Sequence, residues 1–167
     1  KDGLKRMIER NEDVFYYITL YNETYEMPPM PKDAEEGILK GAYLFQRGDK
    51  GSKHVQLFGS GPIIQQALRA QEILADDYDV RADVWSITSY QQLYREARAI
   101  DRWNRRNPRE TKCIPYVTQL LKHAKGPVVT TSDWVQELPQ LLAPYIPNTF
   151  IPLGTNGYGR SDTREAL

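Results

Sequence analysis

Apolar residues recur at two different spacings along the chain, and these spacings predict alternating strands and helices. Runs rich in β-branched and aromatic residues predict strands at 14–20, 55–58, 80–88, 127–131 and 149–153, with a further short strand at 41–45. Helical spacing predicts helices at 64–75, 90–104 and 114–124, and shorter helical stretches at 3–10, 133–134 and 138–143. This alternation indicates a three-layer α/β fold, with a mostly parallel sheet and helices on both of its faces.

The first predicted strand is followed by a segment of different composition. Residues 14–20 read Val-Phe-Tyr-Tyr-Ile-Thr-Leu, which predicts a strand buried on both faces. Residues 22–36 then hold Pro28, Pro29 and Pro31 together with five acidic residues, without any periodicity. Prolines prevent regular strand pairing and favour an extended path, so we expect a linker or a domain boundary here.

Composition narrows the classes of function. The 167 residues are 40% apolar, with 22 basic and 22 acidic residues, which predicts one globular domain. A net charge of zero argues against a general nucleic-acid binder and against an electrostatic membrane binder. The single cysteine, Cys113, favours a reducing compartment. His54 and His123 are the only histidines. One cysteine and two histidines are too few ligands for a structural Cys/His zinc site of the usual kind.

Two glycine-rich segments are candidate contact sites. The strand–turn–helix at Gly59-Ser60-Gly61 could place backbone N–H groups near an anion. The dinucleotide fingerprint needs a third glycine where Ile64 stands, so we favour a tight turn with Ser60 as the N-cap. The loop 154–162, with its glycines, a tyrosine and an arginine, fits either a ligand or subunit contact or a simple turn into a helix.

A basic run is the third candidate. Residues 95–112 hold seven cations and three carboxylates, with Trp103 among them. This pattern fits an acidic partner surface or a phosphate, but the solvated face of a helix with i,i+4 ion pairs is the simpler interpretation. The histidines and Cys113 have no obvious partners, and no pair of carboxylates stands out as an acid–base couple. The residues by themselves indicate no self-contained active site.

Several segments, in order, resemble the homodimeric bacterial type of pyruvate dehydrogenase E1. The stretch 14–31 contains a strand that ends in Asn-Glu-Thr-Tyr and leads into a Met-Pro-rich linker, as in that family. The family's order of motifs continues through Gln56 to Gly61, Asp83 to Tyr90, Arg102-Trp103-Asn104, Thr131 to Trp134 and Gly154 to Asp162. The resemblance covers essentially the whole chain.

The resemblance implies an enzyme that decarboxylates pyruvate with thiamine diphosphate and Mg²⁺ and reductively acetylates the lipoyl group of E2, the dihydrolipoyl acetyltransferase. It assigns residues 1–21 to the end of the preceding pyrimidine-binding domain, 22–40 to an acidic Pro-rich linker and 41–167 to a transketolase C-terminal-like domain. The family's catalytic, cofactor-binding and metal-binding residues belong to domains without a match here. The resemblance therefore implies that this segment binds no cofactor, is inactive alone, and serves structure and homodimer assembly in a cytoplasmic protein.

Within this segment, the resemblance makes Tyr158, Arg160, Ser161 and Asp162 the candidate subunit-interface residues. The chain departs from the family at Asn156, where an aspartate is common. The family also continues beyond the last residue of this sequence, which implies a segment of a longer protein.

Other functions stay open on the sequence alone. They are a related thiamine-diphosphate 2-oxo acid dehydrogenase or transketolase-type enzyme, and a stand-alone phosphate- or nucleotide-binding α/β module using 59–61 and 154–160. A further hypothesis is that the basic run docks on an acidic surface of E2.

Overall fold

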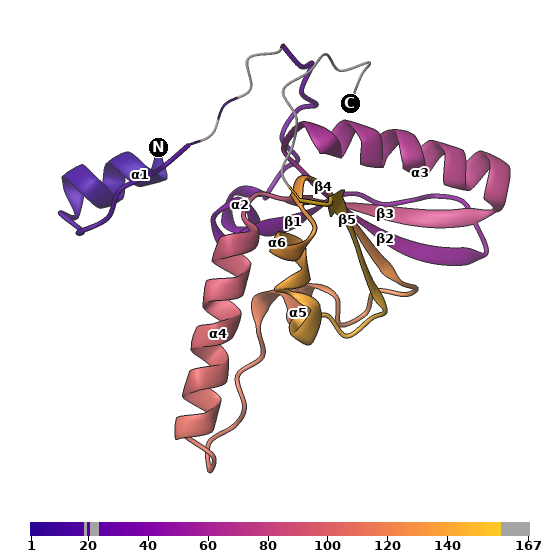
Figure 1. Ribbon diagram of the computed structural model, residues 1–167. Helices are drawn as coiled ribbons and strands as arrows, with labels where there is room; N and C mark the ends of the chain where they lie inside the picture. Colours follow the sequence, from indigo (N-terminus) through magenta and orange to yellow (C-terminus); the bar gives the residue numbers. More distant parts are fainter. Residues whose placement is uncertain (19, 21–23, 158–167) are drawn as a thin grey trace.

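The computed structural model describes residues 1–18, 20 and 24–157. At its centre is one five-stranded sheet in the order β1-β3-β2-β4-β5 (Figure 1). The strands are β1 (Ala42–Gln46), β2 (Lys53–Ser60), β3 (Val80–Ile87), β4 (Val128–Val135) and β5 (Phe150–Thr155). β1 pairs antiparallel with β3, and the other neighbouring pairs are parallel. The prediction of a mostly parallel sheet is confirmed.

Helices lie on both faces of this sheet, as predicted (Figure 1). α3 (Ile64–Tyr78) packs on one face, whereas α4 (Tyr90–Arg106), α5 (Tyr116–Leu120) and α6 (Glu137–Gln140) pack on the other. The remaining elements are α1 (Asp2–Leu4) with a π-helical turn at Lys5–Glu9, α2 (Glu35–Lys40), and 3-10 turns at Gly61–Ile63 and Ala143–Tyr145. α2 falls inside the range 22–40 assigned to the linker, whose proline-rich part has no regular secondary structure.

The longer predicted helices are confirmed with altered ends. α3 and α4 extend beyond 64–75 and 90–104, and α5 covers only the middle of 114–124. The stretch predicted at 138–143 is α6, which ends at Gln140 and is followed by a 3-10 turn. Pro139 does not break α6 because it occupies the first turn, where a backbone N–H has no partner within the helix.

Side-chain alternation along β2 divides the buried core into two layers. On the α3 side, the buried cluster consists of Val55, Leu57, Ile64, Ala67, Ala82 and Val84. All of these residues belong to the continuous β2–α3–β3 unit. The cluster under α4, α5 and α6 contains Phe58 of β2. Its other residues are spread over a much longer stretch of the sequence, from Ala42 to Ile146.

One polar side chain is enclosed on the α4 side of β2. Gln56 is 1% exposed, and its Nε2 donates to the carbonyl oxygen of Lys125 at 2.9 Å. Its Oε1 accepts from Nε1 of Trp85 on β3 at 2.8 Å. Both ends of the amide are therefore paired, which offsets the cost of burying it and ties β3 and the loop before β4 to the central strand.

The same loop approaches β2 most closely at Gly126. The residue has φ +80°, and a Cβ there would lie 1.8 Å from the carbonyl oxygen of His54 and 2.5 Å from its carbonyl carbon. Asn148 holds the loop in place, because its Nδ2 donates to the carbonyl oxygens of Ala124 at 3.1 Å and of Gly126 at 2.7 Å. Both the backbone conformation and the contact require glycine.

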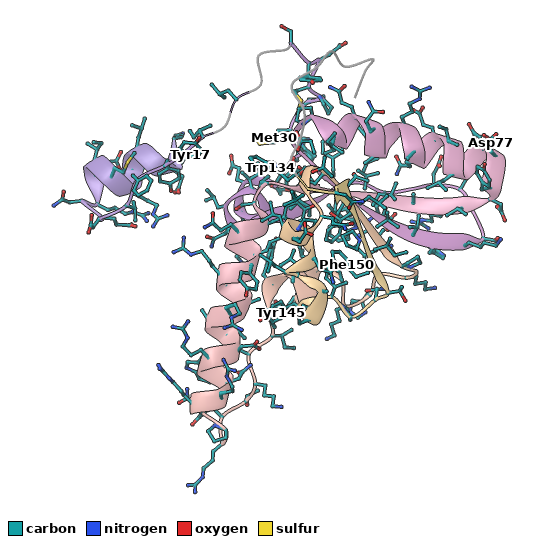
Figure 2. All side chains as sticks on the ribbon, viewed as in Figure 1. Tyr17, Met30, Asp77, Trp134, Tyr145 and Phe150 are labelled. Atoms are coloured by element: carbon teal, nitrogen blue, oxygen red, sulfur yellow. The ribbon has the colours of Figure 1, made fainter. Side chains whose placement is uncertain are left out.

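The strand predicted at 14–20 is wrong for this structure. None of the described residues in that range belongs to a strand, and Phe15, Tyr17, Ile18 and Leu20 are 71–87% exposed (Figure 2 labels Tyr17). A β-prone sequence needs a neighbouring strand to pack against, and within the described residues none lies beside this segment. Its hydrogen bonds stay local; the Tyr16 hydroxyl, for example, donates to Asp2 at 3.0 Å.

The helical stretch predicted at Asp133 and Trp134 is also wrong, because β4 continues through both residues. After an irregularity in the register, Val135 pairs with Thr155 of β5. Pairing with β5 therefore keeps Asp133 and Trp134 extended, and the local sequence of these residues does not reveal that pairing.

Candidate functional site

The carboxyl ends of the parallel strands β2, β3 and β4 meet at one edge of the sheet. β2 leads into α3 on one face, whereas β4 leads into α6 on the other face. Ligands of open α/β sheets bind where neighbouring strands diverge in this way. A cavity of about 720 Å³ lies at this point, between the end of β2, the start of α4, and α6.

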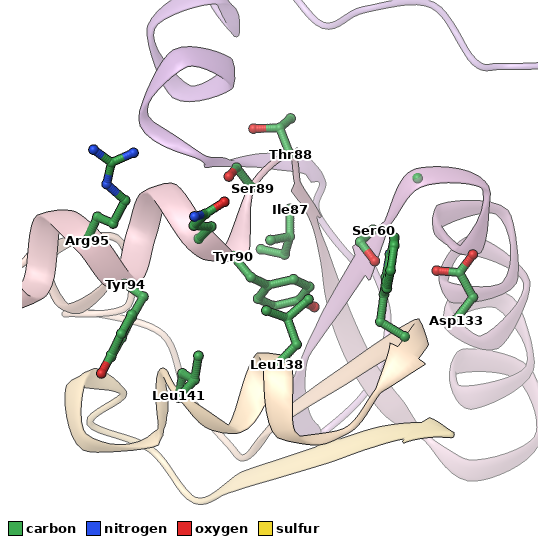
Figure 3. A pocket seen from close by; sticks show the side chains of 13 residues that line it. Ser60, Ile87, Thr88, Ser89, Tyr90, Tyr94, Arg95, Asp133, Leu138 and Leu141 are labelled. Atoms are coloured by element: carbon green, nitrogen blue, oxygen red, sulfur yellow. The ribbon is translucent and has the colours of Figure 1, made fainter. Parts of the chain in front are cut away.

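Aromatic and apolar side chains form about half of the lining of this cavity, and hydroxyl, amide and charged side chains form most of the rest (Figure 3). Its lining residues include Ile87, Tyr90, Tyr94, Trp134, Leu138 and Leu141. In Figure 3 the ring of Tyr90 lies between Tyr94 and Ser60, and Arg95 points away from Tyr94. The exposed charged groups Arg95 and Asp133 belong to α4 and β4. The lining is suited to a flat, partly apolar group and brings together no pair of catalytic carboxylates.

The Gly59-Ser60-Gly61 turn shapes one wall of the cavity. A Cβ at Gly59 would lie 2.9 Å from Cα of Ile64, so glycine allows the start of α3 to approach the strand. Gly61 has φ +53° and opens the 3-10 turn before α3. Ser60 occupies the N-cap position, as predicted, but its hydroxyl makes no capping hydrogen bond. The backbone therefore forms the predicted tight turn, but Ser60 does not make the predicted N-cap hydrogen bond.

Tyr90 acts as a hydrogen-bonding group of this site. It is 6% exposed, and its hydroxyl bonds to Oγ1 of Thr130 on β4. Burial raises the pKa of Tyr90 to about 12, and the hydroxyls of Thr130 and Ser60 oppose only part of that shift. The phenol therefore stays protonated near neutral pH and cannot serve as a general base there.

The raised pKa of Tyr90 predicts a specific loss of stability in alkali. An unfolded tyrosine ionises near pH 10, so the stabilisation is fully present below that pH and is lost as the pH rises toward 12. Between about pH 9 and about pH 11, we expect the free energy of unfolding to fall about 1 kcal/mol further in the unsubstituted protein than in Tyr90→Phe. Urea unfolding across this range measures the difference; two parallel curves would contradict the assignment.

The basic run lies along α4 and the loop that follows it. All seven cations are exposed: Arg95, Arg98, Arg102, Arg105, Arg106, Arg109 and Lys112. Those on the helix recur three and four residues apart, on the side opposite the buried Leu93 and Ala97. The prediction of a solvated helix face is confirmed. Like charges at these spacings destabilise a helix by about 0.2–0.5 kcal/mol per pair.

The predicted i,i+4 ion pairs of this run are wrong. The Glu96 carboxylate accepts from the backbone N–H of Tyr116 at 3.1 and 3.2 Å, and Asp101 accepts from the Tyr145 hydroxyl at 2.8 Å. These two carboxylates are half-buried, and Glu110 is exposed. Within the described part of the chain, no ion pair involves any of the seven cations. Sequence spacing pairs Glu96 and Asp101 with the arginines, but in the fold both carboxylates accept hydrogen bonds from residues that are distant in sequence.

Asn104 is a structural residue that the sequence interpretation missed. Its Oδ1 accepts from the backbone N–H of Cys113, and its Nδ2 donates to the Cys113 carbonyl oxygen, both at 2.9 Å. This two-point contact holds the loop after α4 against the helix. The signal available in the sequence is an amide side chain in the last turn of a basic helix.

The titratable residues considered from the sequence do not form a catalytic group in the described residues. No hydrogen bond joins Cys113 to His54 or His123 there, and no group of three His, Cys, Asp or Glu side chains is placed to hold a metal ion. Over the same residues, none of the helices has the length and hydropathy needed to cross a bilayer. The candidate interface residues Tyr158, Arg160, Ser161 and Asp162 lie outside the described residues.

Comparison with known proteins identifies the domain. The family model of the transketolase-like C-terminal domain matches residues 41–167, which include the whole sheet and the cavity. The chain belongs to this family. The fold expected from the resemblance is confirmed, and the five-stranded sheet with its two helical layers is the transketolase-like domain.

Several relatives of this transketolase-like domain share one name. Proteins called "Pyruvate dehydrogenase E1 component" from Mycolicibacterium smegmatis and Escherichia coli are each 45% identical over 99% of this chain. The Haemophilus influenzae protein of that name is 46% identical over 100% of the chain. The chain spans about a fifth of the length of these relatives (18–19%). The resemblance to the pyruvate dehydrogenase E1 family is therefore confirmed for this segment.

Proposed function

We propose that this chain is the C-terminal domain of a pyruvate dehydrogenase E1 component. The observation that carries the proposal is its identity of 41–46% to proteins of that name over 99–100% of its length. In the proposal, the complete protein is a cytoplasmic homodimer that decarboxylates pyruvate and reductively acetylates the lipoyl group of E2. Bound thiamine diphosphate, with Mg²⁺, would supply the electron sink for that decarboxylation. The domain contributes structure and subunit contacts.

The described residues do not fit a site for thiamine diphosphate and its metal. Mg²⁺ is held by carboxylate oxygens and phosphates, and no group of three acidic or other metal-ligating side chains occurs among residues 1–18, 20 and 24–157. The lining of the cavity at the sheet edge includes a single carboxylate, that of Asp133. We therefore derive no step of the decarboxylation from these side chains. That this segment binds no cofactor stays a prediction.

The proposal is tested by comparing the complete protein with these 167 residues alone. The measurement is pyruvate-dependent reduction of an artificial electron acceptor in the presence of thiamine diphosphate and Mg²⁺. We expect activity in the complete protein and none in the 167-residue chain. Activity in the chain alone would contradict the assignment of the chemistry to other domains.

The same assay separates the related enzymes. Other 2-oxo acids and ketose phosphates serve as alternative substrates for the complete protein. If one of them is used in place of pyruvate, the protein is a different thiamine-dependent enzyme and the proposal fails.

The cavity at the sheet edge keeps a stand-alone nucleotide- or phosphate-binding module as the second candidate function, because Ser60 and Gly61 form part of its wall. A ligand that binds only the folded state raises the melting temperature by mass action. Melting curves with nucleotides and inorganic phosphate would reveal such binding, and a clear increase would favour the module.

A further inference from the structure

We propose that the cationic surface of α4 binds a carboxylate-rich segment of a protein partner. We define the cationic surface as Arg95, Arg98, Arg102, Arg105 and Arg106 of the helix with Arg109 and Lys112 of the loop after it. The proposal does not depend on the proposed enzymatic function, since it rests on the charges and contacts of this surface alone.

The charge of this surface is not neutralised within the described structure. The seven cations are all exposed, and none of them forms an ion pair with a described carboxylate. Of the three acids in the run, Glu96 and Asp101 are turned toward Tyr116 and Tyr145, which leaves Glu110 as the exposed one. Arginines at this spacing repel one another, so an opposite charge on a partner would remove an unfavourable interaction.

The surface is held in a fixed form by contacts at both ends of the loop. Asn104 binds the backbone of Cys113 through two hydrogen bonds, and Glu96 binds the N–H of Tyr116. The C-terminal half of α4 projects away from the sheet, which leaves it accessible from several sides (Figure 1). A surface that is ordered before binding loses less conformational entropy when a partner docks.

The composition of the surface favours a protein partner over a nucleic acid. Trp103 is 40% exposed beside Arg102, and Ile114 is 49% exposed at the end of the loop. Tryptophan and arginine are the residue types that dominate the energy of protein interfaces. The chain as a whole has 22 basic and 22 acidic residues, without the excess of cations typical of nucleic-acid binders. Guanidinium groups pair with carboxylates through two parallel hydrogen bonds, which suits an acidic peptide.

The test measures binding of a fluorescein-labelled polyglutamate peptide to the complete protein by fluorescence anisotropy, at an ionic strength of about 0.15 M and at higher salt. The test variant is Arg102→Gln/Arg105→Gln/Arg106→Gln. The matched control is Lys53→Gln/Arg69→Gln/Lys122→Gln, which removes the same charge from three exposed sites on β2, on α3 and after α5. A duplex DNA serves as the competing probe.

We expect the unsubstituted protein and the control to bind the peptide alike, with an affinity that falls as salt rises. The test variant should bind about tenfold more weakly, or worse. Its melting temperature should be no lower than that of the unsubstituted protein, because the substitutions relieve repulsion between like charges. This combination separates lost binding from lost folding.

Three results would overturn the proposal. The first is no binding of the peptide at about 0.15 M salt. The second is an equal loss of binding in the test variant and the control, which would assign the effect to net charge. The third is tighter binding of DNA than of the peptide through the same arginines, which would make the partner a nucleic acid.

Discussion

Replacing Gly126 with alanine is expected to destabilise the fold by more than about 4 kcal/mol, or to prevent folding. The new Cβ would lie 1.8 Å from the His54 carbonyl oxygen, well inside any contact distance. The obstructing atoms are backbone atoms of the central strand β2, so a change of rotamer cannot relieve the clash. The loop would have to move, which would strain the hydrogen bonds that it accepts from Gln56 and Asn148.

Gly157→Ala is the matched control for this substitution. Gly157 has φ +83°, nearly the same as the +80° of Gly126, but a Cβ there would meet no atom of the described residues within 4 Å. The control therefore carries the cost of the left-handed backbone alone, about 1–2 kcal/mol. Thermal and urea unfolding of the two variants measure the difference. Equal destabilisation of both would show that the contact with His54 does not matter.

Gln56→Ala is expected to have the second-largest effect, a destabilisation of about 3–5 kcal/mol. The substitution leaves a cavity beside Phe58 in the central strand and removes the partner of one buried and one partly buried group. These are the indole N–H of Trp85 and the carbonyl oxygen of Lys125. An unsatisfied buried polar group costs about 1–3 kcal/mol, which applies to the indole N–H of Trp85, whereas the carbonyl oxygen of the exposed Lys125 adds less.

Gln66→Ala provides the control for the glutamine substitution, because Gln66 lies exposed on α3. We expect it to change the free energy of unfolding by less than about 0.5 kcal/mol. A double-mutant cycle of Gln56→Ala with Trp85→Phe should show a coupling of about 0.5–3 kcal/mol. Strict additivity of the two substitutions would mean that their hydrogen bond contributes nothing measurable.

The sequence predicted those elements whose partners lie nearby in the chain. The β2–α3–β3 unit was predicted because its apolar residues follow strand and helix spacing and its turn carries Gly59 and Gly61. The strand predicted at 14–20 failed for the opposite reason. Its residues favour a strand, but strand formation needs a neighbour that periodicity cannot supply. β4 is longer than the predicted strand 127–131 because β5, some twenty residues later in the chain, pairs with the end of β4.

The sequence predicts which residue types form the candidate functional groups. It predicts less well which residues those groups contact. The solvated face of the basic helix follows from its spacing, whereas the use of Glu96 and Asp101 by distant tyrosines does not. The cavity could not be predicted either, since its lining comes from segments between Ser60 and Leu141. Gln56 left only a weak signal, a single amide within an apolar strand.

The residues of the two core layers differ in how far apart they lie in the sequence, and this difference affects the order of folding. The α3-side cluster closes within residues 55–84, so its contacts form over short loops with a small entropic cost. The α4-side cluster joins residues from Ala42 to Ile146 and must close much longer loops. Contacts of high sequence separation form slowly. We therefore expect the β2–α3–β3 unit to be largely formed in the transition state for folding, with β4 docking onto β2 and β5 onto β4 afterwards.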